Sequence, residues 1–229
     1  MDFRLGVVML NTRFPRLPGD IGNPETFPFP VVYRRVEAAT VDAVVRDGAV
    51  VPAAVAGLTA AVRELADEEE VSVIATSCGY LGALQEELQA AVGVPVVASA
   101  FALLPFLRAV YGPEAKVGVL TFDARRLSPS HFGPWAGPED AERIVIEGIE
   151  AGQELHRVIA GDLPELDRTL AEADVLEAGR RLIARAPQVA ALLLECTNLS
   201  PYRQALAAAV GPPVYDLNQA IAWMAAGRA

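Results

Sequence analysis

The chain has 229 residues, of which 52% are hydrophobic and 21% are charged, and this composition excludes a disordered or fibrous protein. At roughly 150 residues per domain, the length predicts one large domain or two small lobes. The 19 Lys and Arg residues against 29 Asp and Glu residues give a formal net charge of −10, which argues against a nucleic acid or an anionic membrane as the main partner because both need a basic surface.

Short apolar runs alternate with longer amphipathic stretches through most of the chain, and this alternation predicts an α/β fold with parallel sheets. The runs are rich in Val, Leu and Ile, as expected for strands that are covered on both faces. The expected strands are Leu5–Leu10, Val71–Thr76, Val94–Ala98, Val117–Thr121, Ala190–Glu195 and Pro213–Tyr215. The expected helices are Ala53–Asp67, Leu81–Val92, Leu166–Arg185 and Tyr202–Val210.

Three further segments bear on the cellular location and on the site. The first strand leads straight into a loop without the basic segment and cleavage site of a secretory signal, which predicts a cytoplasmic protein. The most apolar uncharged stretch, Ala49–Val62, is broken by Pro52 and Gly57 and is too short to span a bilayer, so no transmembrane helix is expected. Residues 13–35 are dense in Pro, Gly and aromatic residues, and we interpret them as an ordered lid or interface loop.

The chain also matches itself at a long spacing. A shift of 118 residues places AAVGVPV, from Ala90, on AAVGPPV, from Ala208, and the same shift places Cys78 on Cys196. A shift of 112 residues places LGVVMLNTR, from Leu5, on VGVLTFDAR, from Val117. Ala-rich matches are common among α/β proteins, but two shifts in the same order along the chain favour a duplication and hence two lobes.

The two cysteines of the chain, Cys78 and Cys196, are too few for a disulfide framework. Each follows an expected strand and begins an expected helix, so both thiols should lie at the sheet edges where ligands bind. A helix start is expected to lower the pKa of a thiol. Two thiols across one cleft could remove a proton from one face of a carbon acid and return one to the other. The alternative is a pair of buried structural cysteines.

These residues resemble the aspartate/glutamate racemase superfamily, which includes cofactor-independent amino-acid racemases, hydantoin racemase, arylmalonate decarboxylase and maleate isomerase. The resemblance covers nearly the whole chain and rests on TSCGYL, VGVLTFDAR and ECTNLSPY. It implies two pseudo-symmetric α/β lobes, each a mostly parallel sheet flanked by helices, with the active site in the cleft between them. Residues 1–98 plus 212–229 would form the first lobe, which carries Cys78, and residues 99–211 the second, which carries Cys196.

The motifs also depart from those of glutamate racemases. Gly79 follows Cys78 where those enzymes usually carry Asn, and Asn198 follows Thr197 where they carry His. Asn11 and Thr12 stand a little beyond the usual place of an Asp-Ser pair. These departures argue against glutamate as the substrate, whereas the two-thiol machinery is retained.

Cys78 and Cys196 are the expected catalytic residues. The expected substrate-binding residues are Asn11, Thr12, Arg13, Ser77, Gly79, Thr121, Thr197 and Asn198. The backbone N–H groups after each cysteine would bind the substrate carboxylate, although Ser77 and Thr197 could equally act as helix caps. Arg13 would serve a second carboxylate, although an arginine in a loop is more often a surface group.

No cofactor is expected. The chain has no Gly-rich phosphate loop, and its single lysine, Lys116, precedes a strand rather than marking a pyridoxal phosphate site. His131 and His156 have no cysteine or carboxylate at metal-ligand spacing, so we expect both in loops or at the surface, and no metal.

The leading functional hypothesis is a cofactor-independent racemase or epimerase of an amino acid or a related α-substituted carboxylate, with a small-molecule carboxylate as its partner. Two alternatives remain open. One is a decarboxylase or cis-trans isomerase on the same scaffold, and the other is a catalytically silent ligand-binding protein. Relatives in the superfamily are often dimers, so the resemblance leaves a homodimer as an option.

Overall fold

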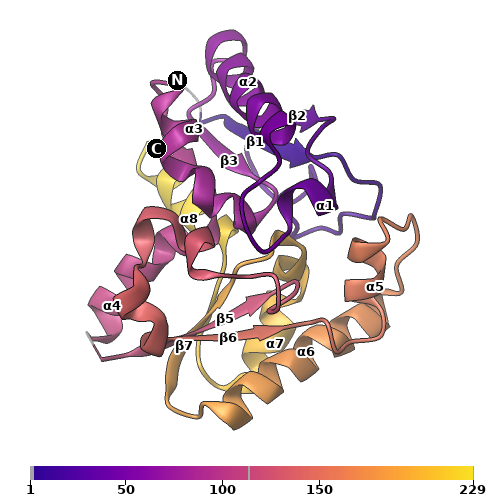
Figure 1. Ribbon diagram of the computed structural model, residues 1–229, viewed down its shortest axis with the longest axis vertical. Coiled ribbons are helices and arrows are strands. Elements are labelled where there is room, and N and C mark those ends of the chain that lie inside the picture. Colours follow the sequence, from indigo (N-terminus) through magenta and orange to yellow (C-terminus); the bar gives the residue numbers. More distant parts are fainter. Residues whose placement is uncertain (1–2, 113, 229) are drawn as a thin grey trace.

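The computed structural model describes residues 3–112 and 114–228, which form two parallel four-stranded sheets (Figure 1). The first sheet, in the order β2-β1-β3-β4, contains β1 (Leu5–Leu10), β2 (Val31–Val36), β3 (Val73–Thr76) and β4 (Val96–Val97). The second, in the order β6-β5-β7-β8, contains β5 (Lys116–Thr121), β6 (Ile144–Gly148), β7 (Val189–Leu194) and β8 (Val214–Tyr215). The equivalent strand orders confirm the expected fold of two pseudo-symmetric α/β lobes.

Helices flank both sheets. The α-helices are α1 (Val41–Val44), α2 (Pro52–Glu68), α3 (Gln85–Ala90), α4 (Leu104–Tyr111), α5 (Leu155–Ala160), α6 (Arg168–Arg185), α7 (Arg203–Val210) and α8 (Leu217–Ala226). Short 3-10 helices are η1 (Gly79–Leu84), η2 (Ala100–Leu103), η3 (Pro129–Trp135), η4 (Pro138–Arg143) and η5 (Thr197–Tyr202). Helix α2 packs on the first sheet, and α6 and α7 pack on the second (Figure 1).

Sequence and burial explain these elements locally. All six residues of β1 are buried, as its unbroken apolar run predicts. Helix α6 begins where the Asp167 side chain accepts hydrogen bonds from two backbone N–H groups, and α8 begins at Asp216 in a capping box with Gln219. Among the described residues, none of the helices combines the length and the apolar character that a bilayer-spanning helix needs.

Two strands were not expected from the sequence. The segment that we interpret as a loop ends at Pro30 rather than at Arg35, because β2 begins at Val31. Most residues of β2 are half-buried, and Arg35 is exposed. β6 is likewise only partly buried. Both are outer strands of their sheets, and an outer strand carries polar side chains that interrupt an apolar run.

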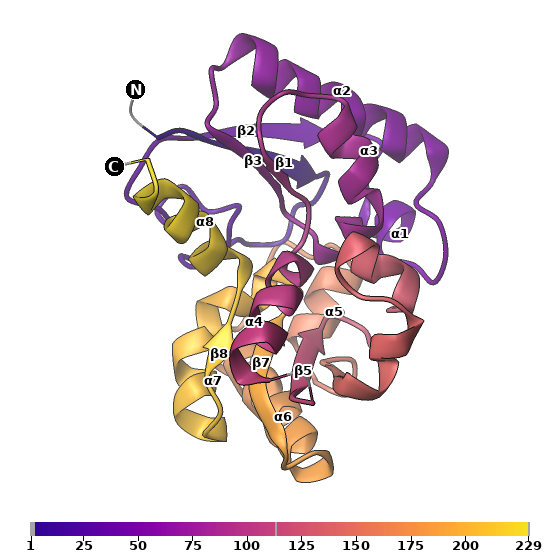
Figure 2. The same ribbon diagram turned by 90° about the vertical axis from the view of Figure 1, so that its left-hand side faces the viewer.

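The C-terminal segment joins both lobes. β8 pairs with β7 and so lies in the second sheet, whereas the sequence placed residues 212–229 in the first lobe. Helix α8 then turns back toward the first sheet, and its Asn218 side chain donates a hydrogen bond to the Gly19 carbonyl in the loop after β1. Both views show the last turn of α8 near the start of β1 (Figures 1 and 2). The lobe boundaries near residues 98 and 211 stay a prediction.

Candidate active site

The two cysteines occupy equivalent places at the ends of the central strands. Cys78 lies two residues after β3 and is the N-cap of η1, and Cys196 lies two residues after β7 and is the N-cap of η5. The carboxyl ends of parallel strands are where α/β proteins place their ligands. Both side chains line one small cavity of about 20 Å³ between the sheets.

The cavity is mostly apolar with a few polar groups. Its apolar and aromatic lining consists of Leu10, Phe14, Val41, Val45, Tyr80, Phe122 and Ile159. Besides the two cysteines and Gly79, its polar lining consists of Arg16, Ser77, Glu195 and Asn198. A concave apolar site with a few convergent polar groups is typical of a small-molecule site.

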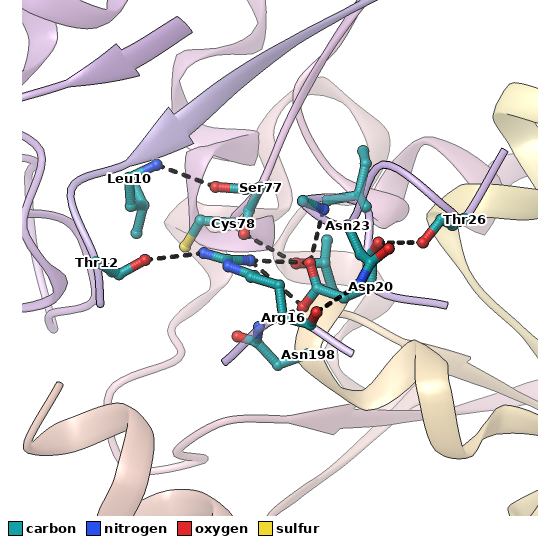
Figure 3. A network of polar contacts seen from close by, with 12 residues as sticks. Leu10, Thr12, Arg16, Asp20, Asn23, Thr26, Ser77, Cys78 and Asn198 are labelled. Atoms are coloured by element: carbon teal, nitrogen blue, oxygen red, sulfur yellow. Dashed lines mark hydrogen bonds and ion pairs between the residues drawn. The ribbon is translucent and has the colours of Figure 1, made fainter. Parts of the chain in front are cut away.

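A polar network connects Cys196 to the loop after β1. The Cys196 thiol donates a hydrogen bond to Oδ1 of Asn198 at 3.5 Å, and Nδ2 of Asn198 donates to Oδ2 of Asp20 at 2.5 Å. Asp20 in turn pairs with Nη1 of Arg16 at 3.1 Å, and Nη2 of Arg16 donates to Oγ1 of Thr12 at 3.2 Å (Figure 3). Asn198 therefore orients the second thiol and is itself held by a buried carboxylate.

Arg16 is the buried cation of this cavity. Its side chain is 10% exposed and its guanidinium lies 4.7 Å from the centre of the Phe14 ring. Nε of Arg16 is buried and donates to no acceptor among the described residues. A guanidinium N–H without an acceptor is available for a ligand carboxylate.

Arg13, which the sequence assigned to this role, lies elsewhere. Its side chain is 72% exposed and forms an ion pair with Asp162 at 3.1 Å. It is not among the residues that line the cavity. Arg13 therefore lies away from the cavity, whereas the neighbouring Arg16 lines it. Both arginines belong to one loop, and no feature of the sequence distinguishes them.

Glu195 is the second residue that the sequence analysis missed. It immediately precedes Cys196, is 1% exposed, and accepts a hydrogen bond from Oγ1 of Thr121 at 2.6 Å through Oε2. Burial raises the pKa of its carboxyl to about 7, against the opposing effect of that hydrogen bond. The sequence does place a glutamate directly before the strand-end cysteine, in the segment ECTN, and this position could have indicated a site residue.

The thiols do not have the lowered pKa that the sequence predicted. Burial, and then the charge of Glu195, raises the pKa of Cys78 to about 12, while hydrogen bonds from backbone N–H groups act in the opposite direction less strongly. Burial and Glu195 also raise the pKa of Cys196 well above its usual value. The backbone N–H groups at the helix start do act to lower the pKa of the thiols, but the loss of hydration on burial raises it by more. In the free protein both shifts favour the protonated thiol over the thiolate.

The remaining expected site residues mostly hold the site together. Oγ of Ser77 accepts from the Leu10 N–H at 3.1 Å, and Oγ1 of Thr197 donates to the Ser77 carbonyl at 2.9 Å, so the two cysteine turns are tied to each other. Thr121 reaches the cavity only through Glu195. Asn11 bonds to the Glu37 carbonyl and does not line the cavity.

Gly79 is required where the two lobes meet. A Cβ atom at this position would overlap both the side-chain and the backbone oxygen of Glu195. We expect Gly79→Ala to lower the free energy of unfolding by about 1–3 kcal/mol, because the buried strand end cannot move aside. Chemical denaturation measures this, with Gly93→Ala as the control because a Cβ there meets nothing within 4 Å. Equal stability of the two variants would contradict the tight contact.

The two histidines differ from expectation. His131 is buried, donates from Nε2 to the Arg46 carbonyl at 3.1 Å and lies edge-on to the Tyr80 ring. His156 lies on α5, stacks on Phe122 and contacts Asp123 at 3.2 Å. Both are therefore packed residues rather than surface groups, since His131 bonds across to Arg46 of the first lobe and His156 bonds to Asp123 within the second.

The sequence is similar to that of several known proteins. The model of the Asp/Glu/hydantoin racemase family matches residues 31–225. A dimethylsulfoniopropionate lyase from Durusdinium sp. clade D is 33% identical over 215 residues, which are 93% of this chain and 70% of that protein. Dimethylsulfoniopropionate lyase 5 from Emiliania huxleyi is 27% identical over 218 residues, and there the match spans 93% of this chain but only 43% of the relative.

Solved structures show the same fold at low sequence identity. Allantoin racemase from Klebsiella pneumoniae superposes with a TM-score of 0.67 at 15% identity, covering 99% of this chain and 87% of that one. A mutant of arylmalonate decarboxylase superposes with a TM-score of 0.62 at 19% identity, covering 99% of this chain and 94% of that one. The fold is thus shared by proteins named for different reactions.

Proposed function

The chain belongs to the Asp/Glu/hydantoin racemase family, and from this premise we propose that it is a cofactor-independent enzyme acting on the carbon next to a carboxylate, with Cys78 and Cys196 as its acid and base. The observation that carries the proposal is that both thiols line one small, mostly apolar cavity. A thiolate positioned beside a C–H bond can act as a general base, and the opposite thiol as a general acid.

The reaction we propose is β-elimination from a sulfonium carboxylate such as dimethylsulfoniopropionate. The thiolate takes the proton from the carbon next to the carboxylate, and that C–H electron pair forms the double bond. The bond between carbon and sulfur breaks, and its electron pair leaves with the neutral sulfide. The products are acrylate, dimethyl sulfide and a proton, which the thiol returns to water. The relative that is 33% identical supports this choice.

Racemisation of an α-substituted carboxylate is the second candidate. The observation that favours it is that the cavity holds two thiols, whereas elimination needs only one base. In racemisation one thiolate removes the proton from one face, and the opposite thiol delivers a proton to the other. Decarboxylation and cis-trans isomerisation on this scaffold would use one cysteine as proton donor or nucleophile.

Arg16 is the proposed anchor of the substrate carboxylate. Its Nε has no acceptor among the described residues and lies in the same cavity as the thiols. The backbone N–H of Tyr80 is one of the groups after Cys78 for which the sequence suggests carboxylate binding; in the free protein it hydrogen-bonds the sulfur of Cys78 and opposes the rise of that thiol's pKa. A carboxylate on Arg16 would leave the neighbouring carbon free to approach a thiol.

Product analysis tests the proposed function. The protein is mixed with dimethylsulfoniopropionate, and dimethyl sulfide is measured in the headspace while acrylate is measured by proton NMR. In parallel, enantiopure amino acids and hydroxy acids are followed for deuterium uptake at the α carbon in D₂O. Sulfide with acrylate supports elimination, and exchange with loss of chirality supports racemisation. Neither product from any compound would contradict both.

The raised thiol pKa values make a prediction about pH. A base whose pKa lies near 12 is mostly protonated at neutral pH, so the reactive thiolate fraction of the free enzyme increases as the pH rises. We expect kcat/KM for the elimination to increase about tenfold per pH unit between pH 7 and pH 9. Initial rates in a series of buffers at constant ionic strength measure this. A plateau already reached below pH 8 would show a thiol whose pKa is lower than the ordinary value and would contradict the prediction.

A further inference from the structure

Glu195 is a buried carboxyl that the proton-transfer mechanism does not use. It lines the cavity that holds both cysteines, and it is 1% exposed. Oε2 accepts from Thr121, but Oε1 is buried and has no hydrogen-bond donor among the described residues. A buried carboxylate oxygen without a donor is costly, so its presence in a cavity indicates a missing partner.

The charges around the cavity show what kind of partner is missing. Arg16 and Glu195 are the two charged residues in its lining, and the charge of Arg16 is already matched by Asp20 at 3.1 Å. Glu195 forms no ion pair with any Lys, Arg or His side chain in residues 3–112 and 114–228. When Glu195 is ionised, the uncompensated charge of the cavity is therefore negative and lies at this residue.

We propose that Glu195 binds the cationic group of a zwitterionic substrate, so that the cavity selects short carboxylates that carry a sulfonium or quaternary ammonium group, while Arg16 holds the carboxylate. This inference rests on the proposed function and names the substrate class of the same site. An onium group has no N–H or O–H to donate, so it suits an oxygen that no donor reaches. Phe14, Tyr80 and Phe122 line the same cavity, and aromatic rings attract such cations.

The interaction between Glu195 and the substrate cation would also link substrate binding to deprotonation of the thiol. Glu195 raises the pKa of both thiols in the free protein. A cation bound against Glu195 offsets that charge, so a thiol gives up its proton more easily once the substrate is in place. After elimination the leaving sulfide is neutral and no longer interacts with Glu195 as a cation, which favours its release.

Two ligands of the same shape and different charge test the proposal. They are 3-(trimethylammonio)propionate and its carbon analogue 4,4-dimethylpentanoate, and calorimetry at pH 8 gives the dissociation constant of each. We expect the wild type to bind the ammonium compound about tenfold or more tightly than the carbon analogue, because a close, desolvated charge pair distinguishes them. Glu195→Gln, which keeps the shape, is expected to reduce this ratio to about one, with the carbon analogue bound as before.

The matched control is Glu177→Gln, which removes an exposed carboxylate on α6 and should preserve the wild-type ratio. If the wild type binds the two ligands with a ratio near one, the proposal is overturned without any variant. This wild-type measurement therefore tests the proposal even if Glu195→Gln does not fold. A ratio that persists in folded Glu195→Gln overturns it as well. These results are separate from the product assay: cation selectivity through Glu195 without sulfide release would reject the elimination and retain the binding site.

Discussion

Replacing the cysteine that acts as the base in the elimination by alanine is expected to lower kcat/KM by about 100- to 10,000-fold, the usual contribution of a positioned acid or base. Elimination needs one base, so the alanine variant of the other cysteine should keep activity within about tenfold of the wild type. Racemisation needs an acid and a base, so under that reaction both single variants should lose activity to a similar extent. Initial rates of sulfide release and of α-proton exchange for Cys78→Ala and Cys196→Ala measure this difference.

The control for these variants is their stability. Both sulfurs are buried, so an alanine variant loses some packing, and its melting temperature must be measured beside its rate. Serine at the same positions keeps the volume closer to that of cysteine and serves as the second variant. Full activity in the double variant Cys78→Ala/Cys196→Ala would contradict the two-thiol mechanism for every reaction considered.

Removing the guanidinium of Arg16 is expected to weaken substrate binding. The change is Arg16→Met combined with Asp20→Asn, because Arg16→Met alone would leave the buried Asp20 carboxylate without its cation. We expect KM for the carboxylate substrate to be about 10- to 100-fold higher in the double variant than in Asp20→Asn alone, because the substrate loses a charge-assisted hydrogen bond. The change in kcat should be smaller. Steady-state kinetics and inhibition by the product acrylate measure both values.

Arg13→Met is the matched control. Arg13 is in the same loop but is 72% exposed and pairs with Asp162, so its loss should change KM less than about twofold, as for most surface ion pairs. Equal effects at the two positions would place the carboxylate elsewhere, for example on the backbone N–H groups after the cysteines.

The fold was largely accessible from the sequence because the central strands are unbroken apolar runs. The runs at β1, β3, β5 and β7 are buried along their length apart from the half-buried Lys116 and Ala190, and the internal repeat relates the first pair to the second. The outer strands β2 and β6 are less apparent in the sequence because they are only partly buried and carry charged side chains, Arg34 and Arg35 in β2 and Glu147 in β6.

The site was accessible only in part. The cysteines could be placed because the ends of parallel strands converge, which depends on the fold alone. Arg16 could not be distinguished from Arg13, because the path of the loop is set by contacts such as that of Asp20 with Asn198, 178 residues apart. The thiol pKa values could not be anticipated either, because they depend on how deeply the two lobes bury the sulfurs and on the proximity of Glu195.

An isotope effect tests the central claim that the thiols of this cavity act on the proton next to the carboxylate. The rate of dimethyl sulfide release is compared for unlabelled dimethylsulfoniopropionate and for the substrate with deuterium at the carbon next to the carboxylate, with the substrate saturating and below KM. The account predicts slower release from the deuterated substrate, because that C–H bond breaks in the step that expels the sulfide. Equal rates for the two substrates, with release that persists when both cysteines are alanine, would contradict it.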